Sequence, residues 1–398
     1  MENRRIAITG LGIVSSVGLG EKEFLQNLSD QVSGIKDISY FKQKGYEIGV
    51  GAQAKDCTAL IPSGLKKYPK PFKNLYASSS MALEKSGILD AIKPHEIGCY
   101  VAGPGCSVEE SENFLRDYLN KGLQNTSLFD LAFATMDSMV NELCYRFKIG
   151  GPRNTILTAC SSSTLAIGMG IDLIKQGEVK AMLVGGADGF SELTYAGFSS
   201  LQNISPTPCS PFDQNRQGLS FGEGSGLLVL EDMEHAKKRG APIYAELLSY
   251  GAFGEGQNLT APSEEGTGYI VSMRQALQEA KINPEKIDYI NAHGTATILN
   301  DKTEAVAVSN VFKNSGPVVS SIKGSIGHCM GAAGALEACA SILSIKHNRI
   351  FGTTNLKSTD ASFKVDIAKD TRESKIKYVL SNSAGFGGNN ASLLFGAI

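Results

Sequence analysis

The sequence lacks the features that would place it in several broad classes. No apolar run approaches the roughly 18 residues that a membrane-spanning helix needs. The formal charge of −2, from 38 basic and 40 acidic residues, gives no indication of nucleic-acid binding. The 8 cysteines form no C-x-x-C pair and several lie in apolar stretches, which favours reduced thiols over a disulfide framework. We therefore expect a cytoplasmic protein that binds neither membrane nor nucleic acid.

The sequence also lacks the motifs of a serine nucleophile, a metal site and a signal peptide. No G-x-S-x-G turn surrounds the serine run 161–163, so a serine nucleophile is not indicated. His328 and Cys329 are adjacent, but no further ligand has a suitable spacing, and we predict no metal site. The glycine-rich stretch after Arg4 and Arg5 lacks the compact apolar core and the cleavage site of a signal peptide.

Length and the order of β-rich runs predict two fused halves. At 398 residues the chain exceeds one ordinary domain, and 42% hydrophobic content is typical of a globular protein. Each half contains three short β-rich runs that end in glycines or small residues. These runs are 99–105, 155–163 and 181–190, followed by 288–296, 318–328 and 378–388. We place the boundary after residue 242, which gives halves 1–242 and 243–398.

The middle run of each half leads into a long apolar segment, 165–174 or 332–345, that is typical of a buried helix. Short apolar strands alternating with helices imply parallel sheets covered on both faces. Two stacked halves of this kind predict an α/β/α/β/α fold with five layers. Functional sites form at the carboxyl ends of parallel strands. Four residues fall at these ends: Cys160, His293, His328 and Phe386.

Cys160 lies at a predicted strand-to-helix corner, where the apolar Ile156 and Leu157 give way to small polar residues. A thiolate is the nucleophile in cysteine chemistry, and a helix N-terminus lowers the pKa of a nearby thiol. His293 and His328 each lie in a glycine-rich turn. One cysteine and two distant histidines in such positions indicate acyl transfer through a thioester, whereas a cysteine without that context is more often a small buried apolar side chain.

Six segments together resemble a β-ketoacyl-acyl carrier protein synthase, a ketosynthase of the thiolase superfamily, most similar to the synthase II type. They are ITGLGIVSSVG near the N-terminus, TACSSS, SPFDQNRQGLSFGEGSGLLVLE (210–231), YINAHGTATILND (289–301), SSIKGSIGHCMGAAG (320–334) and SNSAGFGGNNASLLF (381–395). The resemblance runs nearly end to end. It implies a thiolase-like fold and a decarboxylating Claisen condensation of a cysteine-bound acyl chain with malonyl-acyl carrier protein. It also implies a dimer, either of identical chains or with a ketosynthase-like subunit.

The resemblance implies roles for individual residues. Cys160 accepts the acyl chain, and the backbone N–H groups of Cys160 and Phe386 hold the oxyanion. His293 and His328, as neutral imidazoles, stabilise the enolate left by decarboxylation. Lys323 orients His328 and supplies positive charge. Phe386 also gates the acyl pocket.

Supporting roles are implied for further residues. Glu337 pairs with Lys323, while Thr295 and Thr297 hydrogen-bond the pantetheine arm. No cofactor is implied, because the phosphopantetheine arrives on the carrier protein. A basic cluster offers a docking site for an acidic carrier protein, with a solvated surface as the alternative interpretation. Its members are Lys66, Lys67, Lys70 and Lys73.

Several positions depart from the synthase II pattern without removing a catalytic group. They are Ala296, Ile298, Ala384, Asn389 and the segments 103–108 and 257–262. These changes suggest an altered gate and acyl pocket, and TACSSS is similar to polyketide ketosynthases. We therefore favour a specialised enzyme of a fatty-acid, polyketide or polyene pathway over a housekeeping synthase II.

Two other classes stay open. A chain-length-factor-like partner subunit would be non-catalytic, and retention of the cysteine, both histidines and Lys323 argues against it. A cysteine hydrolase or an acyltransferase that stops at the acyl-enzyme needs only one Cys–His pair. The second histidine and Lys323 would then lack a purpose. Within the superfamily, a thiolase would use another cysteine, and the synthase III type would carry asparagine in place of the second histidine.

Overall fold

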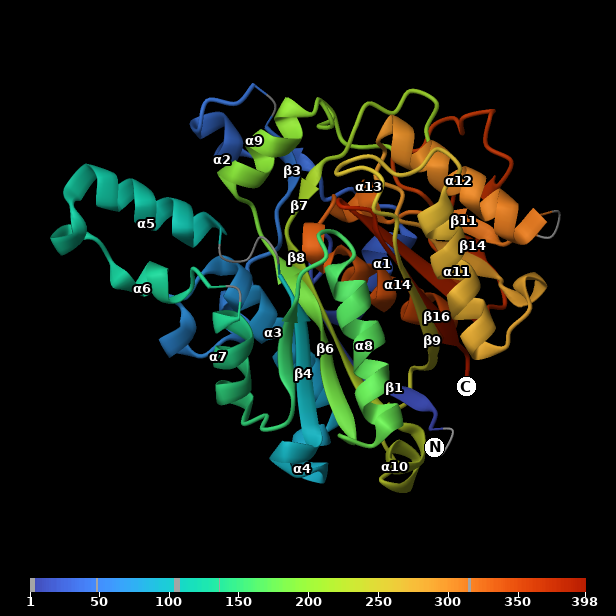
Figure 1. The fold of residues 1–398 in the computed structure, drawn as a ribbon, viewed down its shortest axis with the longest axis horizontal. Helices are drawn as coiled ribbons and strands as arrows, with labels where there is room; N and C mark the ends of the chain where they lie inside the picture. Colours follow the sequence, from blue (N-terminus) through green and yellow to red (C-terminus); the bar gives the residue numbers. More distant parts are fainter. Residues whose placement is uncertain (1–3, 48, 104–107, 136, 314–315) are drawn as a thin grey trace.

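A computed structural model describes residues 4–47, 49–103, 108–135, 137–313 and 316–398, and within these ranges eleven strands form one mixed sheet (Figure 1). The sheet has two halves. The first runs in the order β1 (Ile6–Val14), β8 (Gly224–Asp232), β6 (Ala181–Asp188), β4 (Ile97–Ala102) and β5 (Arg153–Ile156). The second runs β9 (Ala245–Gly254), β16 (Asn389–Gly396), β15 (Tyr378–Gly385), β10 (Tyr289–Asn291), β11 (Val318–Ser320) and β13 (Asp366–Ile367).

The pairing of the strands repeats along with their order. In each half the first three strands pair antiparallel, and the strands beyond them pair parallel. β4, β5 and β6 therefore correspond to β10, β11 and β15, in agreement with the repeat of three runs seen in the sequence. Residues 6–8 of β1 also pair with residues 245–247 of β9, which joins the halves into one sheet. This junction satisfies backbone groups at two strand edges, and it was not predicted from the sequence. The boundary after residue 242 stays a prediction.

Helices cover both outer faces and fill the space between the half-sheets (Figure 1). The outer helices are α3 (Lys70–Ser86) and α7 (Ser138–Phe147) on the first half, and α11 (Thr267–Ala280) and α12 (Ile298–Phe312) on the second. The inner layer is α8 (Ser162–Gln176) and α14 (Ala333–His347), which contact strands of both halves. The predicted five-layered α/β/α/β/α arrangement is confirmed.

Shorter elements surround this frame. The helices are α1 (Gly20–Ser29), α2 (Ser39–Gln43), α4 (Ile88–Ala91), α5 (Val108–Lys121), α6 (Leu128–Ala132), α9 (Glu192–Ser200), α10 (Met233–Lys238) and α13 (Lys323–Ile326). The strands are β2 (Lys36–Asp37), β3 (Val50–Ala52) and β7 (Phe221–Gly222), which form a small sheet, and the pair β12 (Arg349–Ile350) and β14 (Arg372–Glu373). Over the described ranges, no helix combines the length and the apolar character needed to cross a membrane. The altered segment 103–108 lies outside the described residues at positions 104–107.

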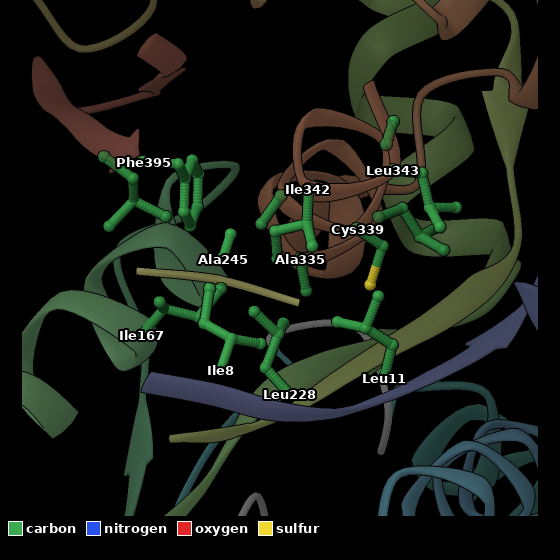
Figure 2. Close-up of a cluster of buried hydrophobic side chains, with 14 of the residues drawn as sticks. Ile8, Leu11, Ile167, Leu228, Ala245, Ala335, Cys339, Ile342, Leu343 and Phe395 are labelled. Atoms are coloured by element: carbon green, nitrogen blue, oxygen red, sulfur yellow. The ribbon is translucent and has the colours of Figure 1, made fainter. Parts of the chain in front are cut away.

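The helix α14 lies at the centre of the hydrophobic core. Its residues 333–345 are all buried. Figure 2 shows Ala335 and Cys339 of α14 facing Leu11 of β1 and Leu228 of β8, and Phe395 of β16 belongs to the same cluster. A helix enclosed by both half-sheets needs mostly apolar or small side chains on every face, which explains the predominantly apolar segment 332–345 in the sequence.

The helices α8 and α14 approach each other closely near their N-termini. A Cβ atom on Gly334 would overlap Thr164 Oγ1 and lie 3.0 Å from Ser383 Oγ. The hydroxyls of Thr164 and Ser383 hydrogen-bond at 2.7 Å, and Ala335 N–H donates to Ser163 Oγ at 2.9 Å. Glycine is required at position 334 by the available space.

The variant Gly334→Ala should lower the free energy of unfolding by about 1–3 kcal/mol, because the added methyl group would push α8 and α14 apart. Denaturant-induced unfolding measures this change. Gly197→Ala is the matched control, since a Cβ atom there would meet nothing within 4 Å. The control should leave stability unchanged or raise it by up to about 1 kcal/mol. Equal effects of the two substitutions would contradict the packing role of Gly334.

Candidate active site

Four loops at the carboxyl ends of strands meet at one cavity of about 470 Å³. Cys160 follows β5, His293 follows β10, His328 follows β11 and α13, and Phe386 follows β15. All four residues line this cavity, whose volume is in the usual range for small-molecule sites. The structure therefore brings together the residues that the sequence placed at strand ends.

Cys160 lies in a constrained turn between β5 and α8. The preceding Ala159 has a φ of +53°, in the left-handed region that non-glycine residues seldom adopt. A Cβ atom on Gly385 would lie 2.6 Å from Thr158 O and 3.1 Å from Cys160 N. Only glycine allows the end of β15 to approach the turn this closely, which places the main chain leading to Phe386 beside the backbone nitrogen of Cys160.

Burial raises the pKa of the Cys160 thiol to about 12, so the expectation that the start of α8 lowers this pKa is wrong. The residue is only 7% exposed, and its lost hydration outweighs the attraction of the nearby Lys323 ammonium. The helix begins at Ser162, two residues after Cys160, and a helix dipole acts mainly within the first turn. The thiol is therefore protonated at neutral pH.

The imidazole rings of His293 and His328 lie at 85° with their centroids 5.3 Å apart. Met330 N–H donates to His328 Nδ1 at 3.2 Å, and Lys323 Nζ donates to His293 Nδ1 at 3.3 Å. A nitrogen that accepts a hydrogen bond carries no proton, so both neutral rings carry their proton on Nε2. Burial, together with the Lys323 charge, holds the pKa of both histidines well below its usual value. Both rings are thus neutral N–H donors.

The Lys323 side chain is fully buried and binds three groups. Its ammonium forms an ion pair with Glu337 and donates to His293 O at 2.5 Å as well as to His293 Nδ1. Lys323 therefore orients His293, which corrects the expectation that it orients His328. The reason is that β11, which leads to Lys323, lies directly beside β10, which leads to His293. His328 is held instead by the backbone of Met330.

A buried carboxylate that sequence reasoning missed supports the His293 loop. Glu304 of α12 accepts hydrogen bonds from His293 N at 2.9 Å and Gly294 N at 2.8 Å. Burial raises the pKa of Glu304 to about 7. Glu304 ends the polar run 300–304 of α12, which is typical of a solvated start of a helix, so the sequence contained no signal for its burial.

Two contacts hold the loop that carries Phe386, and one of them comes from Asn389, a position that departs from the synthase II pattern. Asn389 Nδ2 donates to Phe386 O at 3.0 Å, and Gly387 N–H donates to Leu259 O at 2.7 Å. The Phe386 ring stacks on Phe198 of α9, with centroids 5.0 Å apart and an interplanar angle of 19°. Phe198 also lines the cavity and was not expected from the sequence.

The two threonines predicted to bind the pantetheine arm lie in the cavity, whereas the lysines predicted to bind the carrier protein lie outside it. Thr295 and Thr297 line the cavity, and their hydroxyls hydrogen-bond at 2.9 Å. Lys66 and Lys67 are exposed, as a docking surface requires. Lys70 forms an ion pair with the buried Glu223, so its charge is partly neutralised inside the chain. Among the residues that the structure describes, no group of three His, Cys, Asp or Glu side chains is arranged to hold a metal ion.

The chain matches two family models over most of its length. Residues 3–236 match the N-terminal domain of beta-ketoacyl synthase, and residues 244–357 match the C-terminal domain. The chain belongs to the beta-ketoacyl synthase family. It is 34% identical to 3-oxoacyl-[acyl-carrier-protein] synthase 2 of Coxiella burnetii over 412 residues, covering 100% of both chains. It is 31% identical to the protein of the same name from Staphylococcus aureus, covering 99% of this chain and 98% of the other.

Solved structures of ketosynthases have the same fold as this synthase. The ishigamide ketosynthase/chain length factor superposes with a TM-score of 0.94 at 32% identity, covering 99% of each chain. A type II polyketide ketosynthase in complex with its acyl-carrier protein gives 0.92 at 27% identity, also covering 99% of each. A beta-ketoacyl synthase from Burkholderia phymatum gives 0.90 at 29% identity, covering 99% of this chain and 100% of the other.

The raised pKa of Cys160 predicts the pH dependence of its alkylation by iodoacetamide. Because the thiolate is the reactive form, the rate should rise about tenfold per pH unit from about pH 7 to pH 10 without a plateau. Peptide mapping by mass spectrometry measures alkylation at this residue separately from the other thiols. A plateau below about pH 9 would show that the thiol pKa is not raised.

Proposed function

We propose that this synthase joins an acyl chain held on Cys160 to the two-carbon unit of a malonyl thioester on acyl carrier protein, with loss of carbon dioxide. The observation that carries the proposal is the pair of buried neutral imidazoles, both with the proton on Nε2, lining one cavity with the cysteine. Acyl transfer alone would use one such group, whereas a developing enolate oxygen is stabilised by two N–H donors.

The first step transfers the acyl chain to the enzyme. Cys160 Sγ attacks the thioester carbonyl of an acyl carrier protein, and the backbone N–H groups of Cys160 and Phe386 stabilise the oxyanion. The close approach of Gly385 to Cys160 N supports this pairing of donors. The pantetheine thiol leaves with the proton of the Cys160 thiol, so the exchange consumes no net proton. A thiol that stays protonated until substrate binds is compatible with this step.

The second step forms the carbon–carbon bond. The malonyl thioester loses carbon dioxide, and the electron pair of the broken bond forms an enolate whose oxygen accepts hydrogen bonds from His293 Nε2 and His328 Nε2. The enolate carbon attacks the carbonyl of the acyl-Cys160 thioester. The Cys160 sulfur leaves and takes up one proton from solvent, which releases a β-ketoacyl thioester on the carrier protein. Thr295 and Thr297 hold the pantetheine arm in the cavity.

The Lys323 ammonium, held in place by its ion pair with Glu337, positions the His293 ring and keeps that ring unprotonated at Nδ1. An ammonium beside Nδ1 disfavours a second positive charge on the ring, which preserves the donor at Nε2. Lys323 also contributes positive potential that favours binding of the malonyl carboxylate. We assign it a positioning role toward His293.

The proposal extends to partners and pathway. We assign a dimer, of identical chains or with a ketosynthase-like subunit, supported by similar structures that pair a ketosynthase with a chain length factor.

Lys66 and Lys67 are exposed and available to an acidic carrier protein. The side-chain contact of Asn389 with the Phe386 loop, at a position that departs from the synthase II pattern, supports a specialised fatty-acid, polyketide or polyene pathway rather than a housekeeping role. We place the reaction in the cytoplasm, where the free thiols of this chain stay reduced.

Intact-protein mass spectrometry after incubation with acyl carrier protein thioesters tests the first step. The wild type should gain one acyl group, and malonyl carrier protein should then remove it and yield a product two carbons longer. Cys160→Ala should gain none, because the nucleophile is absent. Cys57→Ala, which removes another buried thiol, is the control and should behave as wild type. An acyl adduct on Cys160→Ala would overturn the assignment of the nucleophile.

The variants His293→Ala and His328→Ala separate the two steps. Each should slow malonyl decarboxylation by about 100-fold or more while slowing acylation less than about tenfold, because the imidazoles stabilise the enolate. Decarboxylation is measured as release of labelled carbon dioxide, and acylation by mass spectrometry. His95→Ala, at an exposed position, serves as control. Equal loss of both steps would contradict the enolate role.

A further inference from the structure

The helix α9 carries one wall of the cavity and is held at its start by a residue of α5. Glu112 Oε1 accepts a hydrogen bond from Leu193 N at 2.7 Å, and Glu112 Oε2 accepts one from Glu192 N at 3.2 Å. These N–H groups belong to the first turn of α9, where a helix has no internal acceptors and favours a negative charge. A carboxylate from a distant segment thus adds to the local cap, in which Ser191 Oγ accepts a hydrogen bond from Thr194 N.

Ion pairs strengthen the same junction. Glu192 Oε2 lies 2.9 Å from Arg116 Nη2 of α5 and 2.9 Å from Lys44 Nζ. The junction therefore fixes the start of α9 through two residues of α5, Glu112 and Arg116. The helices α5 and α6 form an arm that extends from the body of the molecule (Figure 1), and Phe129 of α6 packs against Tyr68 of the body with ring centroids 5.5 Å apart. The arm exposes large apolar side chains: Leu115, Tyr118, Leu119, Leu123, Leu128 and Leu131.

The other end of α9 reaches the gate. Phe198, in the second turn, stacks on Phe386 and contacts Phe221 edge-on with centroids 5.5 Å apart. Tyr195, between the two ends, is buried and stacks on Phe41 at 3.8 Å. Because α9 is one continuous helix of 9 residues, a tilt of its first turn about the buried Tyr195 displaces the Phe198 ring relative to Phe386.

We propose that Glu112 is a positioning residue that sets the acyl-chain preference of the synthase, by holding α9 and thereby the position of Phe198 at the gate. The inference rests on the proposed function, since it concerns entry of the acyl chain to Cys160. Loss of the Glu112 contacts removes two of the hydrogen bonds that hold the start of α9, so the first turn shifts and the Phe198–Phe386 stack loosens. A long acyl chain fills more of the space beside these rings than a short one, so the change alters its acylation rate more.

The test is single-turnover acylation of full-length protein by a purified bacterial acyl carrier protein that carries either a hexanoyl or a hexadecanoyl thioester. The readout is the ratio of the two rates. Glu112→Ala should change this ratio by about tenfold, and Glu112→Gln, which keeps one acceptor, should change it less and in the same direction. Asp117→Asn is the matched control, because Asp117 lies on the same helix and pairs with Lys121 of that helix.

A double variant tests whether Glu112 acts through the gate. In a Phe198→Ala background, Glu112→Ala should leave the ratio unchanged, because Glu112 acts on the ratio only through the ring that this background lacks. A persistent shift in that background, an equal fall of both rates in Glu112→Ala, or an unchanged ratio in both Glu112 variants would each overturn the inference. Should Glu112→Ala fail to fold, the ratio of Glu112→Gln decides. A wild type that accepts neither acyl group would overturn the proposed function as well, whereas normal acylation with an unchanged ratio overturns this inference alone.

Discussion

The buried ammonium of Lys323 is the constraint on which the rest of the site depends. A fully buried charge is strongly unfavourable unless it is paired and hydrogen-bonded, and removal of one partner of such a pair typically costs about 3–5 kcal/mol. Lys323 meets this requirement through Glu337 of α14 and through both the carbonyl and Nδ1 of His293. The ammonium thus ties the central helix to the ends of β11 and β10. Because two of the three groups that bind the ammonium belong to His293, the hydrogen bonds of Lys323 also fix the position of the His293 ring.

The same charge explains why two histidines can act as neutral donors. Each ring uses Nδ1 as an acceptor, one from Lys323 and the other from the backbone of Met330, so Nε2 is left with the proton in both cases. Burial and the ammonium together prevent either ring from acquiring a second proton. A side-chain ammonium and a backbone N–H group thus hold the two rings in the same tautomer, with the proton on Nε2. This arrangement suits an enolate oxygen, and it leaves a hydrolase, which needs one general base, without a use for the second ring.

Much of this arrangement follows from local patterns in the sequence. The repeated order of β-rich runs predicted the layers, and the rule that sites form at carboxyl ends of parallel strands placed Cys160 and both histidines in one region. The features that were not predictable depend on tertiary distances. The pKa of Cys160 is set by burial among residues from both halves, the partner of Lys323 by the adjacency of β10 and β11, and the ion pair of Lys70 by the position of Glu223 in the fold. The periodicity and spacing of residues along the sequence do not indicate which distant residues come into contact in the fold.

In the proposed mechanism, the residues that perform the chemistry are separate from those that admit the chain. Cys160 and the histidines lie at the ends of sheet strands and beside α8 and α14, where space is so tight that Gly334 cannot carry a side chain. The gate is built differently. Phe386 is held by the side chain of Asn389 and rests on Phe198, whose helix is anchored from outside the core. A change at the gate leaves the ammonium and the imidazoles in place, so selectivity for the acyl chain can vary while condensation is retained. Among the positions that depart from the synthase II pattern, Asn389 contacts the gate loop through its side chain, while Cys160, His293 and His328 are all retained.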